Sequence, residues 1–229
     1  MNQEEVEEID SAIIPLLYRY GVVALRGKPV ALNGGGTTCL YVSTRKEVTH
    51  HPDLLYLLGF RLARIIWDAQ EARNCLIGVP MAAINLAVAA SMVSVSESMN
   101  GSRYPILHYE LLRPIKKVHG TTHTWVDGKP NERRHYWLIE NATTTGDSVV
   151  DALRKLTEDG YKTEWFSLII LVNRSSKAIE RLCKLGLKQV VVIYELVDLV
   201  EEFIVRGFWK ENVRGILESD LQTQVVAEK

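Results

Sequence analysis

The chain has 229 residues, of which 47% are hydrophobic and 24% are charged, and its formal net charge is −1. This length suits one sizeable α/β domain with its own core, and the composition is not that of a disordered chain. The near-zero net charge excludes a strongly basic nucleic-acid surface, so any anion site must be built locally.

The cysteines and the N-terminus indicate the compartment. Cys39, Cys75 and Cys183 are far apart and odd in number, which argues against a disulfide framework or a thiolate zinc site. The acidic start, residues 1–10, lacks the pattern of a secretory signal, and the longest mainly apolar run, residues 81–95, is too short to span a bilayer. We expect a cytoplasmic protein with no nucleic-acid or membrane partner.

The first third of the chain predicts a helix, a small β region and a second helix. Apolar residues recur at helical spacing over residues 4–20. Strands are expected at 22–25, 29–32 and 39–42, with a glycine cluster before the third, and a helix is expected from Pro52 to about Ala69.

From Cys75 onward strand and helix signals alternate, which predicts a parallel sheet covered on both faces. Strands are expected at 75–78, 104–109, 136–139, 166–172 and 189–193, and helices after Pro80 and at 148–158, 175–185 and 196–205. The polar segment 113–129 is expected to be a long functional loop or loose hairpin, and the tail from Glu218 is expected to be frayed.

The most informative stretch is residues 136–148, YWLIENATTTGDS, which reads as a buried strand, a Thr/Gly turn and a helix start. Such a turn aims backbone N–H groups and hydroxyls at one point beside a helix N-terminus, which suits a phosphate. Plain helix capping is the alternative, because Ser148 and Asp151 form a capping-box pattern. The pattern alone leaves both interpretations open.

This stretch resembles the phosphoribosyl pyrophosphate motif of type I phosphoribosyltransferases, and three further segments resemble the orotate-specific branch in the same order. Gly78-Val79-Pro80-Met81 resembles its pyrophosphate-side loop, residues 113–120 (RPIKKVHG) its mobile catalytic loop, and residues 171–174 (LVNR) the strand end that carries an orotate-binding arginine. The resemblance covers roughly residues 30–186, and four ordered motifs are more specific than any one.

The resemblance implies the α/β type I phosphoribosyltransferase fold, a central parallel sheet flanked by helices with an N-terminal hood of helix and short strands. One domain would span residues 1–229. Its hood would comprise residues 1–45, its core 75–195, and its C-terminal helix and tail 196–229.

The resemblance also implies orotate phosphoribosyltransferase activity, the transfer of ribose 5-phosphate from phosphoribosyl pyrophosphate to orotate. Mg²⁺ would be bound mainly through the substrate, without direct protein ligands, and a homodimer would share its active sites. The implied catalytic residues are Arg113, Lys117, His119, Glu140 and Asn141. The implied phosphate-binding residues are Thr143, Thr144, Thr145, Gly146, Asp147 and Ser148, and the implied orotate-binding residues are Arg174 and Asn33.

Five positions depart from the family pattern. Asn33 and Pro114 stand where basic residues are usual, and Asn141 and Asn173 stand where acidic residues are usual. Asp147 replaces a small neutral residue, and its charge about 6 Å from a phosphate would oppose binding by roughly 3 kcal/mol unless its side chain points away. Lys28, Arg45 and Lys116 are candidate substitutes for the missing cations.

Three hypotheses follow. The chain is an active orotate phosphoribosyltransferase, or a catalytically impaired phosphoribosyltransferase-fold protein that acts as a nucleotide-binding or regulatory subunit, or an active enzyme that uses another base. We favour the first, because Glu140, the Thr144–Gly146 loop, Arg174 and the basic loop residues are all present.

Overall fold

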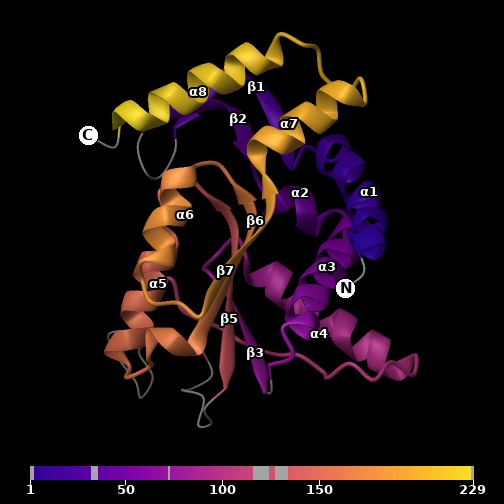
Figure 1. Ribbon diagram of the computed structural model, residues 1–229, viewed down its shortest axis with the longest axis vertical. Helices are drawn as coiled ribbons and strands as arrows, with labels where there is room; N and C mark the ends of the chain where they lie inside the picture. Colours follow the sequence, from indigo (N-terminus) through magenta and orange to yellow (C-terminus); the bar gives the residue numbers. More distant parts are fainter. Residues whose placement is uncertain (1–2, 32–35, 72, 116–123, 127–133, 228–229) are drawn as a thin grey trace.

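A parallel sheet forms the centre of the computed structural model, which describes residues 3–31, 36–71, 73–115, 124–126 and 134–227, the last seven without side chains (Figure 1). Within these residues the sheet has five strands in the order β4-β3-β5-β6-β7. The strands are β3 (Asn74–Gly78), β4 (His108–Glu110), β5 (His135–Thr143), β6 (Phe166–Asn173) and β7 (Gln189–Glu195). The predicted α/β class and parallel sheet are confirmed.

Helices lie on both sides of this sheet (Figure 1). One side carries α5 (Asp147–Glu158) and α6 (Ser176–Cys183), and the other carries α1 (Gln3–Arg19), α3 (Pro52–Asp68), α4 (Ile84–Met99) and α7 (Leu196–Val205). The short helix α2 (Lys46–Thr49) precedes α3, and a 3₁₀ turn, Thr163–Trp165, precedes β6.

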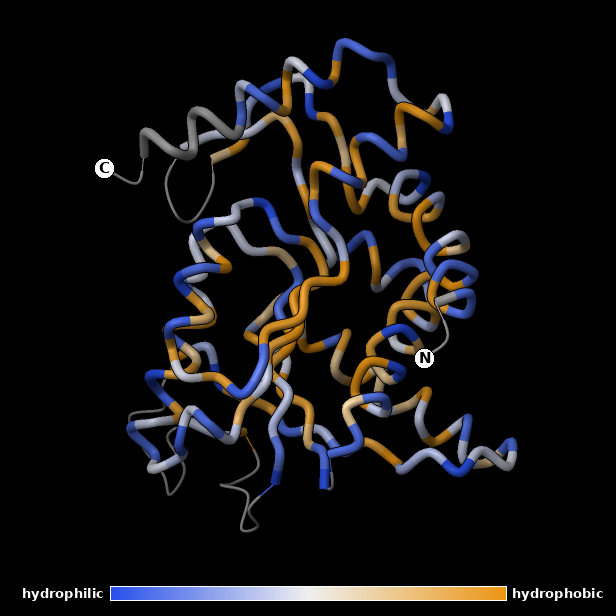
Figure 2. Tube along the Cα trace, in the orientation of Figure 1, coloured by the Kyte–Doolittle hydropathy of each residue, from blue (hydrophilic) through white to orange (hydrophobic). Residues whose placement is uncertain are grey.

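The buried strands divide their side chains between two cores. Trp137 and Ile139 belong to the core beneath α1, α3, α4 and α7, whereas Tyr136 and Leu138 belong to the core beneath α5 and α6. This alternation follows from the two-residue period of a strand. Because both faces are covered, the strands are apolar along their length, which Figure 2 shows as orange tubes through the centre.

A second, antiparallel sheet has two strands, β1 (Val23–Ala31) and β2 (Thr37–Val42), and is called the hood below. The helix α1, which the prediction included in the hood, packs mainly against α3. The prediction of separate strands at 22–25 and 29–32 was wrong, because residues 23–25 and 29–31 both belong to β1. The register shifts between Leu25 and Val30, where the chain passes through Gly27 and Pro29. An irregularity in the ladder accommodates a proline that cannot donate a hydrogen bond, so the strand continues beyond it.

Two further predictions need correction. A strand was expected at 104–109, but β4 covers residues 108–110. Tyr104 and Pro105 are held outside it, because Tyr104 stacks on Trp67 and the Pro105 carbonyl accepts a hydrogen bond from the Trp67 indole. The segment from Glu218 to Ala227, expected to be part of a frayed tail, belongs to α8 (Val213–Ala227), which packs against β2. None of the described helices is long and apolar enough to cross a membrane.

Candidate active site

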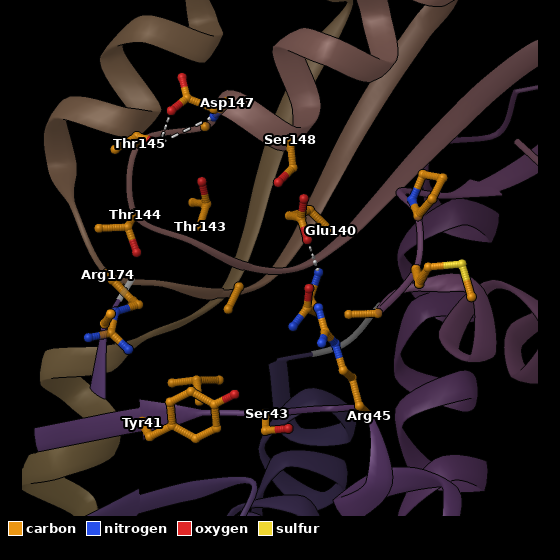
Figure 3. Close-up of a pocket in the computed structure, with 18 residues that line it drawn as sticks. Tyr41, Ser43, Arg45, Glu140, Thr143, Thr144, Thr145, Asp147, Ser148 and Arg174 are labelled. Carbon is orange, nitrogen blue, oxygen red and sulfur yellow. Dashed lines mark hydrogen bonds between the residues drawn. The ribbon is translucent and has the colours of Figure 1, made fainter. Parts of the chain in front are cut away.

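A cavity of about 280 Å³ lies at the carboxyl ends of β5 and β6, beneath the hood (Figure 3). Ligands of parallel α/β sheets bind at this edge. The cavity is lined by Ala31, Tyr41, Val42, Ser43, Arg45, Pro80, Met81, Ala82, Glu140, Asn141, Ala142, Thr143, Thr144, Thr145, Gly146, Asp147, Ser148 and Arg174. It therefore unites the predicted phosphate loop, part of the pyrophosphate-side loop and the predicted orotate arginine.

The predicted phosphate loop begins inside a strand. Strand β5 extends four residues beyond the predicted 136–139 and ends at Thr143, so Glu140 and Asn141 are strand residues. Gly146 then adopts a φ of +81° and directly precedes α5. The helix starts one residue before Ser148 and has no side-chain hydrogen bond from its N-cap, so the capping-box alternative was wrong.

Glu140 is a buried carboxylate at the floor of the cavity. It is 4% exposed, and its Oε1 accepts a hydrogen bond of 2.8 Å from the Asn141 N–H. Its Oε2 is buried without a hydrogen-bond partner among the described residues. Burial raises the pKa of Glu140 to about 7, although the Asn141 and Ala142 N–H groups oppose the shift. An unpartnered buried oxygen is costly, so it is placed to receive donors from a ligand.

The charge of Asp147 is balanced within the protein. Its Oδ1 lies 2.6 Å from Nη1 of Arg181, and this nitrogen also donates to the Thr145 carbonyl at 2.8 Å. The hydrogen bonds from Arg181 and Thr145 lower the pKa of Asp147. Figure 3 shows the carboxylate pointing away from Thr144 and the cavity interior. The side chain of Asp147 therefore points away from the predicted phosphate position, which was the condition for Asp147 not to oppose phosphate binding.

The predicted pyrophosphate-side loop closes another side of the cavity. Pro80 and Met81 line it, and the peptide bond between them is cis. Val79 donates to the Ile139 carbonyl at 2.8 Å, which ties the loop to β5. A Cβ on Gly78 would lie 2.4 Å from the Ala83 carbonyl oxygen, so a side chain at this position would displace the start of α4.

Arg174 lines the cavity, but much of its guanidinium is bound to the hood. The side chain is 5% exposed, Nη1 donates to the Leu40 carbonyl and Nη2 donates to the Thr38 hydroxyl, each at 2.8 Å. The Nε has no hydrogen-bond partner among the residues that the structure describes. The adjacent Asn173 donates to Glu195 at 2.8 Å and accepts from the Ser175 N–H, so it joins the ends of β6 and β7.

The predicted basic loop is described only at its base. Arg113 does not line the cavity; its guanidinium donates to the carbonyls of Trp125 and Val126 at 3.0 and 3.1 Å. Leu112 and Trp125 form an antiparallel bridge, and Lys155 donates to the Pro114 carbonyl. Asn33, Lys117 and His119 lie outside the described residues. Their predicted roles stay predictions.

The hood adds residues that the motifs did not single out as site residues. Tyr41, Val42, Ser43 and Arg45 line the cavity, at the end of β2 and just beyond it. Arg45, one of the candidate substitutes for the missing cations, is exposed and lies across the cavity from Arg174 (Figure 3). No local sequence signal marks these positions, because the packing of the hood on the sheet decides which segment covers the cavity.

Comparisons with known proteins place this site in a family context. No model of a known protein family matches the chain. A curated orotate phosphoribosyltransferase of Methanothermobacter thermautotrophicus is 29% identical over 187 residues, which are 82% of this chain and 92% of the relative. The chain is a homologue of orotate phosphoribosyltransferases.

Solved structures agree on the fold. The orotate phosphoribosyltransferase of Aeropyrum pernix aligns with a TM-score of 0.62 and 23% identity, over 83% of this chain and 97% of that one. The Mycobacterium tuberculosis enzyme in complex with 5-phospho-α-D-ribosyl 1-diphosphate aligns with a TM-score of 0.58 and 20% identity, over 83% and 98%. The chain therefore has the type I phosphoribosyltransferase fold predicted from its motifs.

Proposed function

We propose that the chain is an orotate phosphoribosyltransferase of pyrimidine nucleotide biosynthesis. The observation that carries the proposal is the cavity in which the Thr/Gly loop, the unpartnered oxygen of Glu140 and two arginines meet, in a homologue of these enzymes. The bond from the ribose C1′ to pyrophosphate breaks, and a bond from C1′ to a ring nitrogen of orotate forms. Pyrophosphate leaves with the electron pair of the broken bond, and the proton of that nitrogen passes to the pyrophosphate or to water.

The cavity residues divide this work. Residues 143–148 bind the 5′-phosphate at the start of α5, where backbone N–H groups favour an anion. Glu140 accepts hydrogen bonds from the ribose hydroxyls, and the amide of Asn141 donates a hydrogen bond to them. The ionised carboxylate of Glu140 favours cationic character at C1′. Arg174 faces the orotate carboxylate through the nitrogen that the hood leaves unbound.

Cationic support for the leaving pyrophosphate is assigned to Arg45 together with Arg113, Lys117 and His119. Arg45 has no ion-pair partner among the described residues, and it lines the cavity, as Met81 does. Its charge compensates there for the basic residues that Asn33 and Pro114 replace. The role of the three loop residues rests on the resemblance of residues 113–120 to the catalytic loop of the family.

Mg²⁺ fits this site as an ion carried by the substrate. The cavity offers the free carboxylate oxygen of Glu140 and threonine hydroxyls, which are hard oxygen donors of the kind that Mg²⁺ prefers. The described residues contain no cluster of three His, Cys, Asp or Glu side chains that could hold a metal ion by themselves. The bound ion supplies Lewis-acid neutralisation of the pyrophosphate charge.

We also propose a homodimer located in the cytoplasm. An apolar groove of about 900 Å³ runs between α3 and α4 and shares Arg45, Met81 and Ala82 with the cavity. A second copy seated on this groove would exclude water from Tyr56 and Met92, which are exposed in one chain. The three cysteines are free, as in proteins of reducing compartments.

The deciding experiment mixes purified protein with orotate, phosphoribosyl pyrophosphate and Mg²⁺ and follows pyrophosphate release and the orotate absorbance. We expect turnover in the wild type and a loss of at least about a hundredfold in kcat in Lys117→Ala, since a cation at the leaving group is removed. Lys184→Ala, which changes an exposed lysine outside the cavity, is the matched control. Binding of both substrates without turnover would support the regulatory hypothesis. Turnover with a different base and none with orotate would support the hypothesis of an enzyme that uses another base.

A further inference from the structure

The C-terminal helix α8 carries an acidic residue on its buried face. Val213, Leu217 and Asp220 are spaced by four and three residues, so they share one face of the helix. Val213 and Leu217 are buried in the core beneath α1, α3, α4 and α7. A carboxylate that continues an apolar stripe loses hydration, so it needs specific hydrogen-bond donors.

Strand β2 supplies three such donors to a single carboxylate oxygen. The Oδ2 of Asp220 accepts hydrogen bonds from the Thr38 hydroxyl at 2.6 Å and from the Cys39 N–H at 3.0 Å. It also accepts at 3.1 Å from the Leu40 N–H, which is shared with the Thr38 hydroxyl oxygen at 3.0 Å. Hydrogen bonds to an ionised acceptor are about twice as strong as neutral ones. Asp220 therefore clamps the middle of β2 to α8.

The clamp extends to Arg174 through Thr38. The hydroxyl of Thr38 has one hydrogen, and its shortest contact is with Asp220, while its oxygen accepts from Nη2 of Arg174 at 2.8 Å. The other terminal nitrogen of Arg174 donates to the Leu40 carbonyl, also at 2.8 Å. Burial lowers the pKa of Arg174, and the charge of Asp220 opposes that shift. One hydroxyl thus joins a buried cation to a carboxylate from the far end of the chain.

The same strand leads into the cavity. Tyr41 follows Leu40, and Ser43 and Arg45 lie just beyond the end of β2, so a shift of β2 moves the hood side of the cavity. A shift of Thr38 or Leu40 also releases the terminal nitrogens of Arg174. A shift of β2 would therefore change the positions of the hood residues and of Arg174. The proposed phosphate loop is held separately, by its connection to α5 and by the hydrogen bond from Arg181 to the Thr145 carbonyl.

We infer that Asp220 is a positioning residue of the active site, which holds β2 and the Arg174 guanidinium in the geometry that binds the base substrate. This inference rests on the proposed function and deepens it. It assigns to α8 a role in substrate recognition, although α8 does not line the cavity.

The test compares Asp220→Ala and Asp220→Asn with the wild type in steady-state kinetics and in hydrogen exchange of the Cys39 and Leu40 amides. Both variants should raise the KM for orotate about tenfold, change the KM for phosphoribosyl pyrophosphate less than about threefold, and accelerate exchange at both amides. Glu218→Ala, which removes an exposed acidic residue of the same helix, should leave both KM values and the exchange rates of the two amides unchanged.

Thr38→Val provides a second route if Asp220→Ala does not fold. It keeps the shape of the side chain, removes the hydroxyl link and should raise the KM for orotate by a similar factor, with no further rise when combined with Asp220→Asn. Unchanged orotate KM and unchanged amide protection in folded Asp220→Asn would overturn the inference. So would equal increases in both KM values, which indicate general loosening.

A wild-type chain without turnover would count against the proposed function and not against the clamp. In that case calorimetric binding of orotate and the two amide exchange rates test Asp220 directly. Weaker orotate binding with faster exchange supports the clamp, and unchanged values in folded Asp220→Asn refute it.

Discussion

At the residue scale, Glu140 couples the site to pH. Its pKa of about 7 in the folded protein lies above the ordinary value of 4.5, so the folded state binds the proton more tightly than the unfolded state. The free energy of unfolding therefore falls as pH rises from about 4.5 to 7, by up to about 3 kcal/mol from this group. The protein retains a carboxylate whose ionisation opposes folding, as expected of a functional group.

Glu140→Gln should stabilise the protein at pH 8 by about 1–3 kcal/mol and change its stability little at pH 5, where Glu140 is already protonated. The same variant should lower kcat/KM for phosphoribosyl pyrophosphate at least about tenfold, because the ribose loses an anionic acceptor. Urea denaturation at both pH values measures the first effect, with exposed Glu164→Gln as the control. An equal gain at both pH values would contradict the assigned pKa.

The pair of Asp147 and Arg181 makes a second prediction at the residue scale. Both side chains are about half exposed, so their ion pair adds at most about 1 kcal/mol to stability. Arg181→Ala should nevertheless raise the KM for phosphoribosyl pyrophosphate several-fold, because an unpaired carboxylate then stands beside the 5′-phosphate.

Adding Asp147→Asn to Arg181→Ala should restore the KM, since the repelling charge is gone. Steady-state kinetics of the single and double variants measure this coupling. Arg154→Ala, which removes an arginine paired with Glu158 on α5, is the control. A double variant as poor as Arg181→Ala alone would show that Arg181 acts by another route.

At the scale of elements, the turn between β5 and α5 depends on a glycine. Gly146 has a φ of +81°, and a Cβ there would meet the Leu182 side chain of α6 at 3.1 Å. A side chain would therefore strain the backbone and push the turn away from α6. The geometry of the loop therefore depends on the turn that connects β5 to α5 and on the packing of α6 against that turn.

Gly146→Ala should lower the free energy of unfolding by about 1–2 kcal/mol and weaken phosphoribosyl pyrophosphate binding at least about tenfold. Gly101→Ala is a matched control, because Gly101 has a φ of +87° with open space around its Cβ position. It should show a comparable loss of stability without loss of binding in calorimetry. Equal binding losses in both variants would mean that the effect is global.

At the scale of the whole molecule, the groove between α3 and α4 predicts assembly. Met92 is 62% exposed within the groove, whereas Met99 is 83% exposed near the end of α4 and does not line it. Met92→Lys should convert a dimer to monomers and reduce kcat, because a charge would be buried at the proposed interface. Sedimentation velocity and kinetics measure both effects, and Met99→Lys should change neither. A monomeric wild type would refute the homodimer.

Sequence alone determined the framework. The strands at 75–78 and 166–172 and the helices at 52–69 and 148–158 matched the structure within a few residues. Continuous apolar runs and helical spacing are local signals that any packing of this chain must satisfy. The motif around Glu140 and Gly146 also placed the predicted phosphate loop at the carboxyl edge of the sheet, since a strand, a turn and a helix are contiguous in the chain.

Tertiary structure alone decided the partners. Arg181 lies 34 residues from Asp147 and Asp220 lies 182 residues from Thr38, so no local pattern pairs them. Arg174 is a third case. The family resemblance assigned its guanidinium to orotate, whereas in the folded chain both terminal nitrogens donate to β2. Periodicity determines which residues are buried, whereas packing of distant elements determines what each buried polar group meets and which of its atoms face a ligand.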